Sequence, residues 1–295
     1  MKVIGIGDNV VDQYSHIQTR YPGGNALNFS VYATLLGCPA AYLGVFGDDS
    51  AAAQVRATLQ QLGVDASRCR QVSGENGRAS LTIEQGERRF LGSNQGGVSR
   101  FTSMDFVLDD PDYLKSFALI HTSSYSYLDA QLPAISRLGV PLSYDFSDDF
   151  QLTAALALCP WLDFAFFSCA ELTLEHSRDI LSQAVAAGAG CAVATRGAQP
   201  ALLFNGQRWY EQMPRQVVPV DTLGAGDAFI TAFLLAYFNP SVRAEVGKEG
   251  MSRSRTLANI TAPDADRMVA SLALAADFAA DICLQEGSFG FGERY

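Results

Sequence analysis

Hydrophobic positions along the chain follow two periods that alternate from the first residues to the last. Short runs rich in β-branched and aromatic residues predict strands at 2–6, 41–46, 118–121, 142–146, 164–167 and 192–195. Apolar residues spaced three to four apart predict helices at 29–36, 51–62, 128–138, 172–187, 228–236 and 268–284. Strands that alternate with helices are typical of an α/β protein, in which helices cover both faces of a mostly parallel sheet. The pattern predicts a single α/β domain over residues 1–295.

The segment 77–97 departs from this rhythm. Ala79, Leu81 and Ile83 alternate with polar neighbours, and a glycine-containing turn follows at 85–87. This alternation predicts a β-hairpin with one apolar face. Together with residues 12–22, the hairpin is expected to form a small β lid beside the main sheet. An apolar lid face is compatible with a homodimer formed through the lid.

The charge balance restricts the partners that the protein can bind. The chain has 31 acidic and 21 basic residues, a formal net charge of −10, which repels phosphate backbones and anionic membrane surfaces. We therefore expect neither nucleic acid nor a membrane as a partner. No apolar run approaches the ~20 residues that cross a bilayer. The first predicted strand follows Met1 directly and leaves no room for a signal peptide, so we expect a cytoplasmic protein.

Two further features are assigned no chemistry. The six cysteines include no Cys-x-x-Cys pair and the three histidines lie far apart, so we expect buried free thiols and no zinc site. Residues 240–264 combine Gly, Ser and Pro with four basic residues, which predicts a mobile surface insertion. A basic nucleic-acid arm is the alternative, but no aromatic residues are interleaved with the charges.

The first glycine-rich turn does not fit a dinucleotide-binding fingerprint. Residues 5–10 place Val10 where the third glycine of Gly-x-Gly-x-x-Gly would stand. Asp8 would also repel a pyrophosphate at that turn. Asp8 instead suits a sugar, because carboxylates and amides exchange hydrogen bonds with vicinal hydroxyls. A role of Asp8 in forming the turn is the alternative.

The strongest chemical signal is the string Val-Asp-Thr-Leu-Gly-Ala-Gly-Asp-Ala-Phe at 220–229. A predicted strand at 217–220 precedes it and a predicted helix follows. Between them, the small residues 224–226 leave backbone N–H groups free to bind an anion where the helix dipole is positive. Asp227 beside this cradle suits a base that takes the proton of an attacking hydroxyl. A strand–turn–helix connection with an acidic cap is the alternative.

At this point the sequence resembles the ribokinase-like (PfkB) carbohydrate kinases, whose signature reads Asp-Thr-x-Gly-Ala-Gly-Asp. The Gly-Gly-Asn motif at 23–25, the Gly-Asp-Asp at 47–49, Thr195-x-Gly197 and the closing alanine-rich helix with Gly287 occur in the family's order. The resemblance covers nearly the whole chain outside 240–264. It implies a ribokinase-like fold, ATP and Mg²⁺ as cofactors, and a kinase that phosphorylates an alcohol.

The resemblance also implies roles for individual residues. Asp227 matches the catalytic base and Gly224, Ala225 and Gly226 match the anion hole. On the sugar side, the matching residues are Asp12, Gly24, Asn25 and Asn28. On the nucleotide side, they are Thr195, Gly197, Gly226 and Ala276. Asp221 matches a carboxylate that helps to hold a monovalent cation, such as K⁺, in many members.

One motif departs from the family pattern. The Asn-x-x-Glu motif, which organises magnesium and phosphate, is replaced by Ser-Cys-Ala-Glu at 168–171. Glu171 is therefore expected in the Mg²⁺ shell. Ser168 stays near the nucleotide, although its side chain is shorter than asparagine. Arg196 is expected either beside the phosphates or as a solvated surface residue.

Within the family, the head region looks most like the fructoselysine 6-kinases. The shared strings are Gly-Asp-Asn-x-x-Asp at 7–12, Gly-Gly-Asn-Ala-x-Asn at 23–28 and Asp-Phe-Ser-Asp at 145–148. The likeness implies a fructosamine substrate, a fructose joined to an amino acid through nitrogen. Arg88 on the hairpin is the candidate that receives the amino-acid portion. A fructokinase, ribokinase or nucleoside kinase, and a non-catalytic sugar- or nucleotide-binding relative, are the alternatives.

Overall fold

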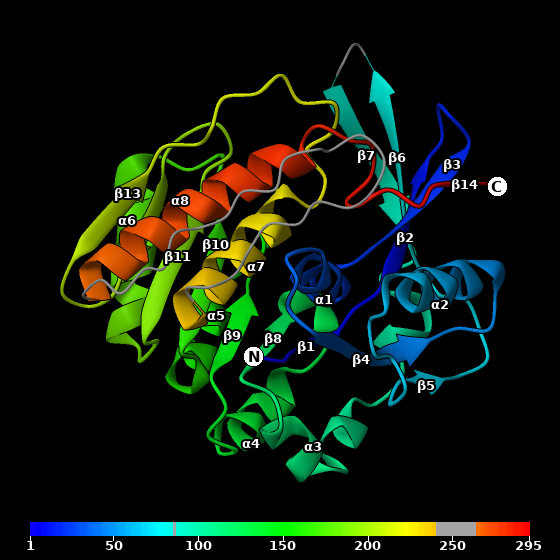
Figure 1. Cartoon of the computed structure of the whole chain (residues 1–295), viewed down its shortest axis with the longest axis horizontal. Coiled ribbons are helices and arrows are strands. Elements are labelled where there is room, and N and C mark those ends of the chain that lie inside the picture. Colours follow the sequence, from blue (N-terminus) through cyan, green and yellow to red (C-terminus); the bar gives the residue numbers. More distant parts are fainter. Residues whose placement is uncertain (85–86, 240–263) are drawn as a thin grey trace.

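The computed structural model describes residues 1–84, 87–239 and 264–295, without the side chains of 83, 84, 87, 88 and 264–266. Its main sheet has nine strands in the order β13-β12-β11-β10-β9-β8-β1-β4-β5 (Figure 1). The pairs from β11 to β5 are all parallel, whereas β12 pairs antiparallel with both β11 and β13 at one edge of the sheet. The strands are β1 (Val3–Gly7), β4 (Ala40–Phe46), β5 (Arg70–Gln71), β8 (Leu119–Ser123), β9 (Leu142–Asp145), β10 (Phe164–Ser168), β11 (Cys191–Thr195), β12 (Ala201–Phe204) and β13 (Trp209–Gln212).

Helices cover both faces of this sheet, as the alternation predicts. Neighbouring strand residues point to opposite faces, so Val3 and Phe166 belong to one hydrophobic cluster and Ile4 and Phe167 to the other. The first face is covered by α1 (Asn25–Leu35), α2 (Ser50–Leu62), α7 (Ala225–Phe238) and α8 (Asp264–Ile282). The second is covered by α3 (Pro111–Lys115), α4 (Leu132–Ser136), α5 (Leu152–Leu158) and α6 (Leu174–Ala186).

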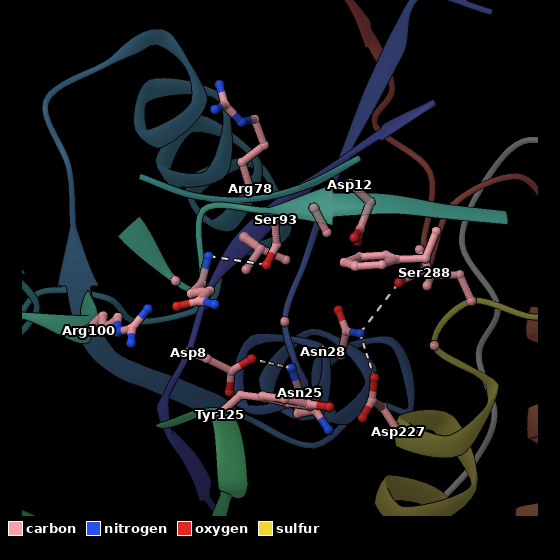
Figure 2. Close-up of a pocket in the computed structure, with 18 of the residues that line it drawn as sticks. Asp8, Asp12, Asn25, Asn28, Arg78, Ser93, Arg100, Tyr125, Asp227 and Ser288 are labelled. Atoms are coloured by element: carbon pink, nitrogen blue, oxygen red, sulfur yellow. Dashed lines mark hydrogen bonds between the residues drawn. The ribbon is translucent and has the colours of Figure 1, made fainter. Parts of the chain in front are cut away.

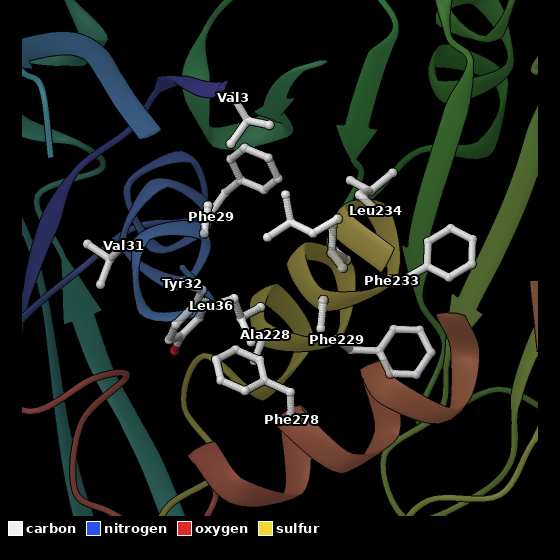
Figure 3. Close-up of a cluster of buried hydrophobic side chains, with 14 of the residues drawn as sticks. Val3, Phe29, Val31, Tyr32, Leu36, Ala228, Phe229, Phe233, Leu234 and Phe278 are labelled. Carbon is white, nitrogen blue, oxygen red and sulfur yellow. The ribbon is translucent and has the colours of Figure 1, made fainter. Parts of the chain in front are cut away.

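Helix α7 is largely buried on the first face. Its nine residues from Ala228 to Ala236 are all buried, because it packs on the sheet, on α1 and on α8. Figure 3 shows α1, α7 and α8 contributing side chains to one cluster. Tyr32 of α1 packs edge-on against Phe278 of α8, with ring centroids 5.6 Å apart. Helices α1, α7 and α8 therefore pack together on this face.

A second, five-stranded sheet has the order β14-β3-β2-β6-β7 and lies beside the main sheet (Figure 1). Only Asp8 and Asn9 separate β1 from β2, so the second sheet starts at the carboxyl edge of the main sheet. Tyr14, Tyr21 and Leu81 form its small core. Its strands are β2 (Val10–Tyr14), β3 (Thr19–Gly23), β6 (Gly77–Glu84), β7 (Glu87–Ser93) and β14 (Glu293–Arg294).

Two sequence predictions of secondary structure are wrong. The segment 217–220 is not a strand, and Val218 is 88% exposed. Pro219 has no N–H for a ladder and no neighbouring strand pairs here, so β-branched residues alone do not form one. The predicted helix 128–138 is reduced to a 3₁₀ turn and α4, with Pro133 at the start of α4.

Several expectations concern features away from the sheets. All six cysteines are free thiols; four are buried, while Cys69 and Cys283 are half-buried. No helix in the described part of the chain is both long and apolar enough to cross a membrane. The predicted insertion at 240–264 lies outside the described residues, apart from the backbone at its last position.

Candidate active site

A cavity of about 460 Å³ lies between the carboxyl edge of the main sheet and the second sheet. Asp227 and Gly224 of the 220–229 motif line it together with Asp12 from β2 (Figure 2). The predicted sugar-side residues Asp8, Gly24, Asn25 and Asn28 also line it. The structure therefore brings together residues that are as far apart in the sequence as Asp8 and Asp227. The predicted Arg88 side chain lies outside the described part.

Asp227 lies in the first turn of α7, which follows the cap residue Gly224 and has Ala225 as its first helical residue. Its carboxylate accepts a hydrogen bond of 2.6 Å from the Asn28 side-chain amide. Loss of solvation raises the pKa of Asp227 well above its ordinary value, and the charge of Asp145 adds to this effect, while the Asn28 bond opposes it. A carboxyl group with a raised pKa binds a proton more strongly than a free aspartate.

The turn before α7 requires glycine at position 224. Gly224 has φ +75°, and an added Cβ would lie 2.4 Å from the Tyr32 hydroxyl oxygen. At Gly226 an added Cβ would meet nothing within 4 Å, so its backbone borders open space. The Ala225 N–H lies 3.3 Å from the Thr222 carbonyl oxygen. That bond takes up the Ala225 N–H, but a helix leaves its first N–H groups without acceptors within the helix, which is what an anion-binding turn requires.

Asp8 supports the first turn of α1. Its carboxylate accepts hydrogen bonds from the N–H groups of Asn25 at 2.7 Å and Ala26 at 3.1 Å. The hydroxyls of Ser123 and Ser126 donate to it, both at 3.0 Å. Since Gly24 at the cap position has no side chain, Asp8 caps the helix from outside. Asp8 therefore borders the cavity with its carboxylate oxygens already bonded.

Asp145 lies behind the cavity wall, and among the sequence motifs it occurs only as the first residue of the string at 145–148. It ends β9, is 4% exposed, and accepts a hydrogen bond of 2.8 Å from the Asn25 side-chain amide. Burial raises the pKa of Asp145 to about 6. Its position at a strand end was the available signal, because parallel strands end at the same edge of a sheet. Residues that do line the cavity but had no sequence signal include Arg78, Phe90, Arg100, Tyr125, Tyr127 and Ser288.

A second cavity, of about 490 Å³, adjoins the other side of the α7 turn. Ala225 and Gly226 line it, whereas Gly224 and Asp227 line the first cavity. The two cavities therefore meet at the first turn of α7. The predicted nucleotide-side residues Ser168, Thr195, Arg196, Gly197, Gly226 and Ala276 all line the second cavity.

Arg196 is not a solvated surface residue, so that alternative is wrong. It is 5% exposed, and its guanidinium donates to the Leu172 carbonyl at 3.3 Å and to the Gln199 side chain at 2.5 Å. Glu171, by contrast, is exposed and does not line the second cavity. In the described part of the chain, no three His, Cys, Asp or Glu side chains cluster so as to hold a metal ion.

Asp221 lines neither cavity and is 7% exposed. Its carboxylate accepts hydrogen bonds from the Tyr14 hydroxyl, from the Gly287 N–H at 3.1 Å and from the Leu223 N–H at 3.0 Å. Three donors thus direct the positive ends of their dipoles at the carboxylate that was expected to bind a monovalent cation. This donor set does not suit a cation, because the three N–H and O–H dipoles that point at the carboxylate would repel one and already occupy three of its about four lone-pair positions.

The chain is similar in sequence to a known family and to known members of it. Residues 2–262 match the family described as pfkB family carbohydrate kinase. The chain is 38% identical to fructosamine kinase FrlD of Bacillus subtilis, over 100% of this chain and 95% of the relative. It is 31% identical to fructoselysine 6-kinase of Escherichia coli, over 79% of this chain and 87% of the relative.

Solved structures with low sequence identity share the fold. Ribokinase of Giardia lamblia superposes with a TM-score of 0.75 at 15% identity, covering 98% of this chain and 94% of the other. Fructokinase of Xylella fastidiosa with bound ATP superposes with a TM-score of 0.74 at 16% identity, with the same coverage. The predicted α/β, ribokinase-like architecture is confirmed.

Proposed function

Because this chain belongs to the pfkB family of carbohydrate kinases, we propose that it transfers the γ-phosphoryl group of ATP to a primary hydroxyl of a fructosamine. The observation that carries the proposal is the meeting of two cavities at the first turn of α7, with Asp227 on one side and Gly226 on the other. The 38% identity to a fructosamine kinase over the whole chain supports this substrate class over free sugars.

In this mechanism the ketose occupies the first cavity and the nucleotide the second. Asp227 accepts the proton of the attacking hydroxyl, so that the oxygen becomes a better nucleophile as it approaches phosphorus. The N–H groups at the start of α7 receive the negative charge that develops on the transferred phosphoryl group. Asn28 holds the Asp227 carboxylate in place through the 2.6 Å hydrogen bond.

Mg²⁺ fits this arrangement without a preformed cluster of carboxylates. The ion commonly keeps several waters and is bound by substrate phosphates and one or two carboxylates, and it would neutralise phosphate charge. Glu171, exposed beyond the end of β10, is the carboxylate available for its shell, and Ser168 lines the second cavity. The surroundings of Asp221 do not fit K⁺, so no step involves that ion.

The first cavity differs in charge between its two ends. Asp227 and Asn28 lie on one side of it, and Arg100 lies on the opposite side (Figure 2). A fructosamine that carries an amino acid has a polyol at one end and a carboxylate at the other. Arg100, which is exposed and lies over the Phe101 ring at 5.7 Å, is available to receive that carboxylate. Arg78 also lines the cavity but pairs with Glu75 at 3.7 Å.

The test is a coupled assay of ADP release with fructosyl amino acids, fructose, ribose and nucleosides as acceptors. The proposal expects a higher kcat/KM for a fructosyl amino acid than for free fructose, because groups built to receive the amino acid stay unpaired with the shorter sugar. An equal or higher kcat/KM for fructose, ribose or a nucleoside would replace the fructosamine with that substrate. No turnover of any acceptor, with binding retained, would favour a non-catalytic relative.

A further inference from the structure

Tyr14 is buried at the point where the second sheet meets the motif loop. It ends β2, is 1% exposed, and its hydroxyl donates a hydrogen bond to Asp221. The two residues are 207 positions apart in the sequence. A buried hydroxyl with a carboxylate partner makes a charge-assisted hydrogen bond, which is among the stronger ones in proteins. The contact therefore links β2 to the segment that leads into α7.

The Asp221 carboxylate also accepts hydrogen bonds from backbone N–H groups on both sides of the anion-binding turn. One of its oxygens accepts the Leu223 N–H at 3.0 Å, and Leu223 directly precedes Gly224. The other oxygen accepts the Gly287 N–H at 3.1 Å as well as the Tyr14 hydroxyl. Ser288, which follows Gly287, has its hydroxyl 3.4 Å from the Asn28 amide that holds Asp227.

A buried carboxylate must be balanced by a cation or by hydrogen-bond donors. At Asp221 the balance comes from two backbone N–H groups and one phenol. We propose that the Tyr14 hydroxyl does at Asp221 what a monovalent cation would do, and so holds the anion-binding turn in its reactive position without K⁺. Tyr14 is thus a positioning residue, and the inference rests on the phosphoryl transfer proposed above.

The proposal has two consequences. Turnover by the unaltered protein does not depend on the monovalent cation present. Loss of the phenol oxygen leaves the turn less well placed, which lowers kcat more than it raises KM, because the turn acts on the transferred phosphoryl group.

Tyr21 provides a matched control for Tyr14. Its ring contacts the Tyr14 ring edge-on at 5.1 Å, and its hydroxyl donates to Glu286 at 2.7 Å. Tyr14→Phe and Tyr21→Phe therefore each remove one phenol–carboxylate bond from the same small core. Only Tyr14→Phe removes a donor from Asp221, so any general loosening of this core affects both variants.

The first measurement is steady-state kinetics of both variants, well below their melting temperatures, with the best acceptor found. We expect Tyr14→Phe to lower kcat about 10-fold or more with both KM values within about threefold, and Tyr21→Phe to stay within about threefold of the original kcat. Equal losses in the two variants, or no loss in Tyr14→Phe, would overturn the positioning role.

The second measurement compares K⁺ with tetramethylammonium at constant ionic strength in the unaltered protein. We expect kcat within about twofold in the two salts. We also expect the same Tm, since a bound ion would stabilise the fold by mass action. Activation by K⁺, or a higher Tm in K⁺ than in tetramethylammonium, would overturn the proposal. The Tm comparison needs no substrate, so it remains decisive even if the proposed kinase activity fails.

Discussion

The Asn28 side-chain amide donates a 2.6 Å hydrogen bond to Asp227, and so joins the first turns of α1 and α7 across 199 positions of sequence. Three residues earlier, Asn25 donates to Asp145 at 2.8 Å from the same end of α1. The side-chain oxygen of Asn28 (Oδ1) is buried at the cavity wall and has no hydrogen-bond partner among the described residues. That oxygen is available to accept a hydrogen bond from a sugar hydroxyl while the amide holds the base.

Asn28→Ala tests both of these contacts. Removing the hydrogen bond that lowers the pKa of Asp227 allows that pKa to rise further, so the acid limb of the kcat/KM profile should move to higher pH. The value of kcat/KM at the optimum should fall about 10–100-fold, because the base is less well placed and a substrate contact is lost. A pH–rate profile of the variant checks this. An unshifted acid limb would show that Asn28 does not tune the base.

Asp145→Asn should shift the profile in the opposite direction. The charge of Asp145 helps to raise the pKa of Asp227, so its removal should lower that pKa and move the acid limb to lower pH. Asparagine keeps an oxygen that can accept the Asn25 hydrogen bond. The comparison of the two profiles in one buffer series is the measurement, and a shift to higher pH would contradict the account.

Asp145 should also affect stability in a pH-dependent way. Its pKa is raised from 3.8 to about 6 in the fold, so folding favours the protonated form. The contribution is therefore fully present below about pH 4 and is lost as the pH rises through about 6. The difference in unfolding free energy between Asp145→Asn and the unaltered protein should change in favour of the variant from pH 4.5 to pH 7.5. Urea unfolding at these two pH values, which lie on either side of the raised pKa, measures the difference in unfolding free energy.

Arg100→Met should reduce discrimination between substrates. We expect kcat/KM for a fructosyl amino acid to fall about 10-fold, with fructose changed less than about threefold, because only the first carries a carboxylate. The amide of the same fructosyl amino acid should lose less than the free acid. Arg78→Met is the matched control, since Arg78 already pairs with Glu75. Equal losses on fructose and on the fructosyl amino acid would remove Arg100 from recognition.

Gly224→Ala should destabilise the protein and inactivate it. An alanine there would be strained at φ +75° and would clash with the Tyr32 hydroxyl, whereas Gly63, also at φ +75°, has nothing within 4 Å of an added Cβ. Gly63→Ala should lose only the backbone strain, about 1–3 kcal/mol, and keep its activity. Gly224→Ala should lose more, as measured by urea unfolding, and turnover should fall with it. Equal unfolding energies would contradict the close approach of Tyr32.

The sequence predicts most of the fold because local period and turn chemistry determine the strands and helices around β1, β4 and β8 to β11. It also brings Asp227 and Asn28 to one site, since both lie next to glycine-rich turns. The sequence does not predict the contacts and strand pairings that join residues far apart in the chain. The Tyr14 hydroxyl that donates to Asp221 belongs to the second sheet, far away in the sequence. The segment 217–220 has strand-forming residues, but no strand in the described part of the chain pairs with it. The burial of Arg196 likewise involves a contact with the Leu172 carbonyl, 24 positions away in the sequence.

In the proposed reaction, Asp227 takes the proton of the attacking hydroxyl where the two cavities meet. Asp227→Asn keeps the size of the side chain but cannot accept that proton. The decisive measurement is kcat of Asp227→Asn with a fructosyl amino acid, together with calorimetric binding of that substrate and of ATP. The account predicts a fall in kcat of about 10²–10⁴-fold, with both ligands still bound. Turnover within a few-fold of the unaltered protein would show that the base lies elsewhere.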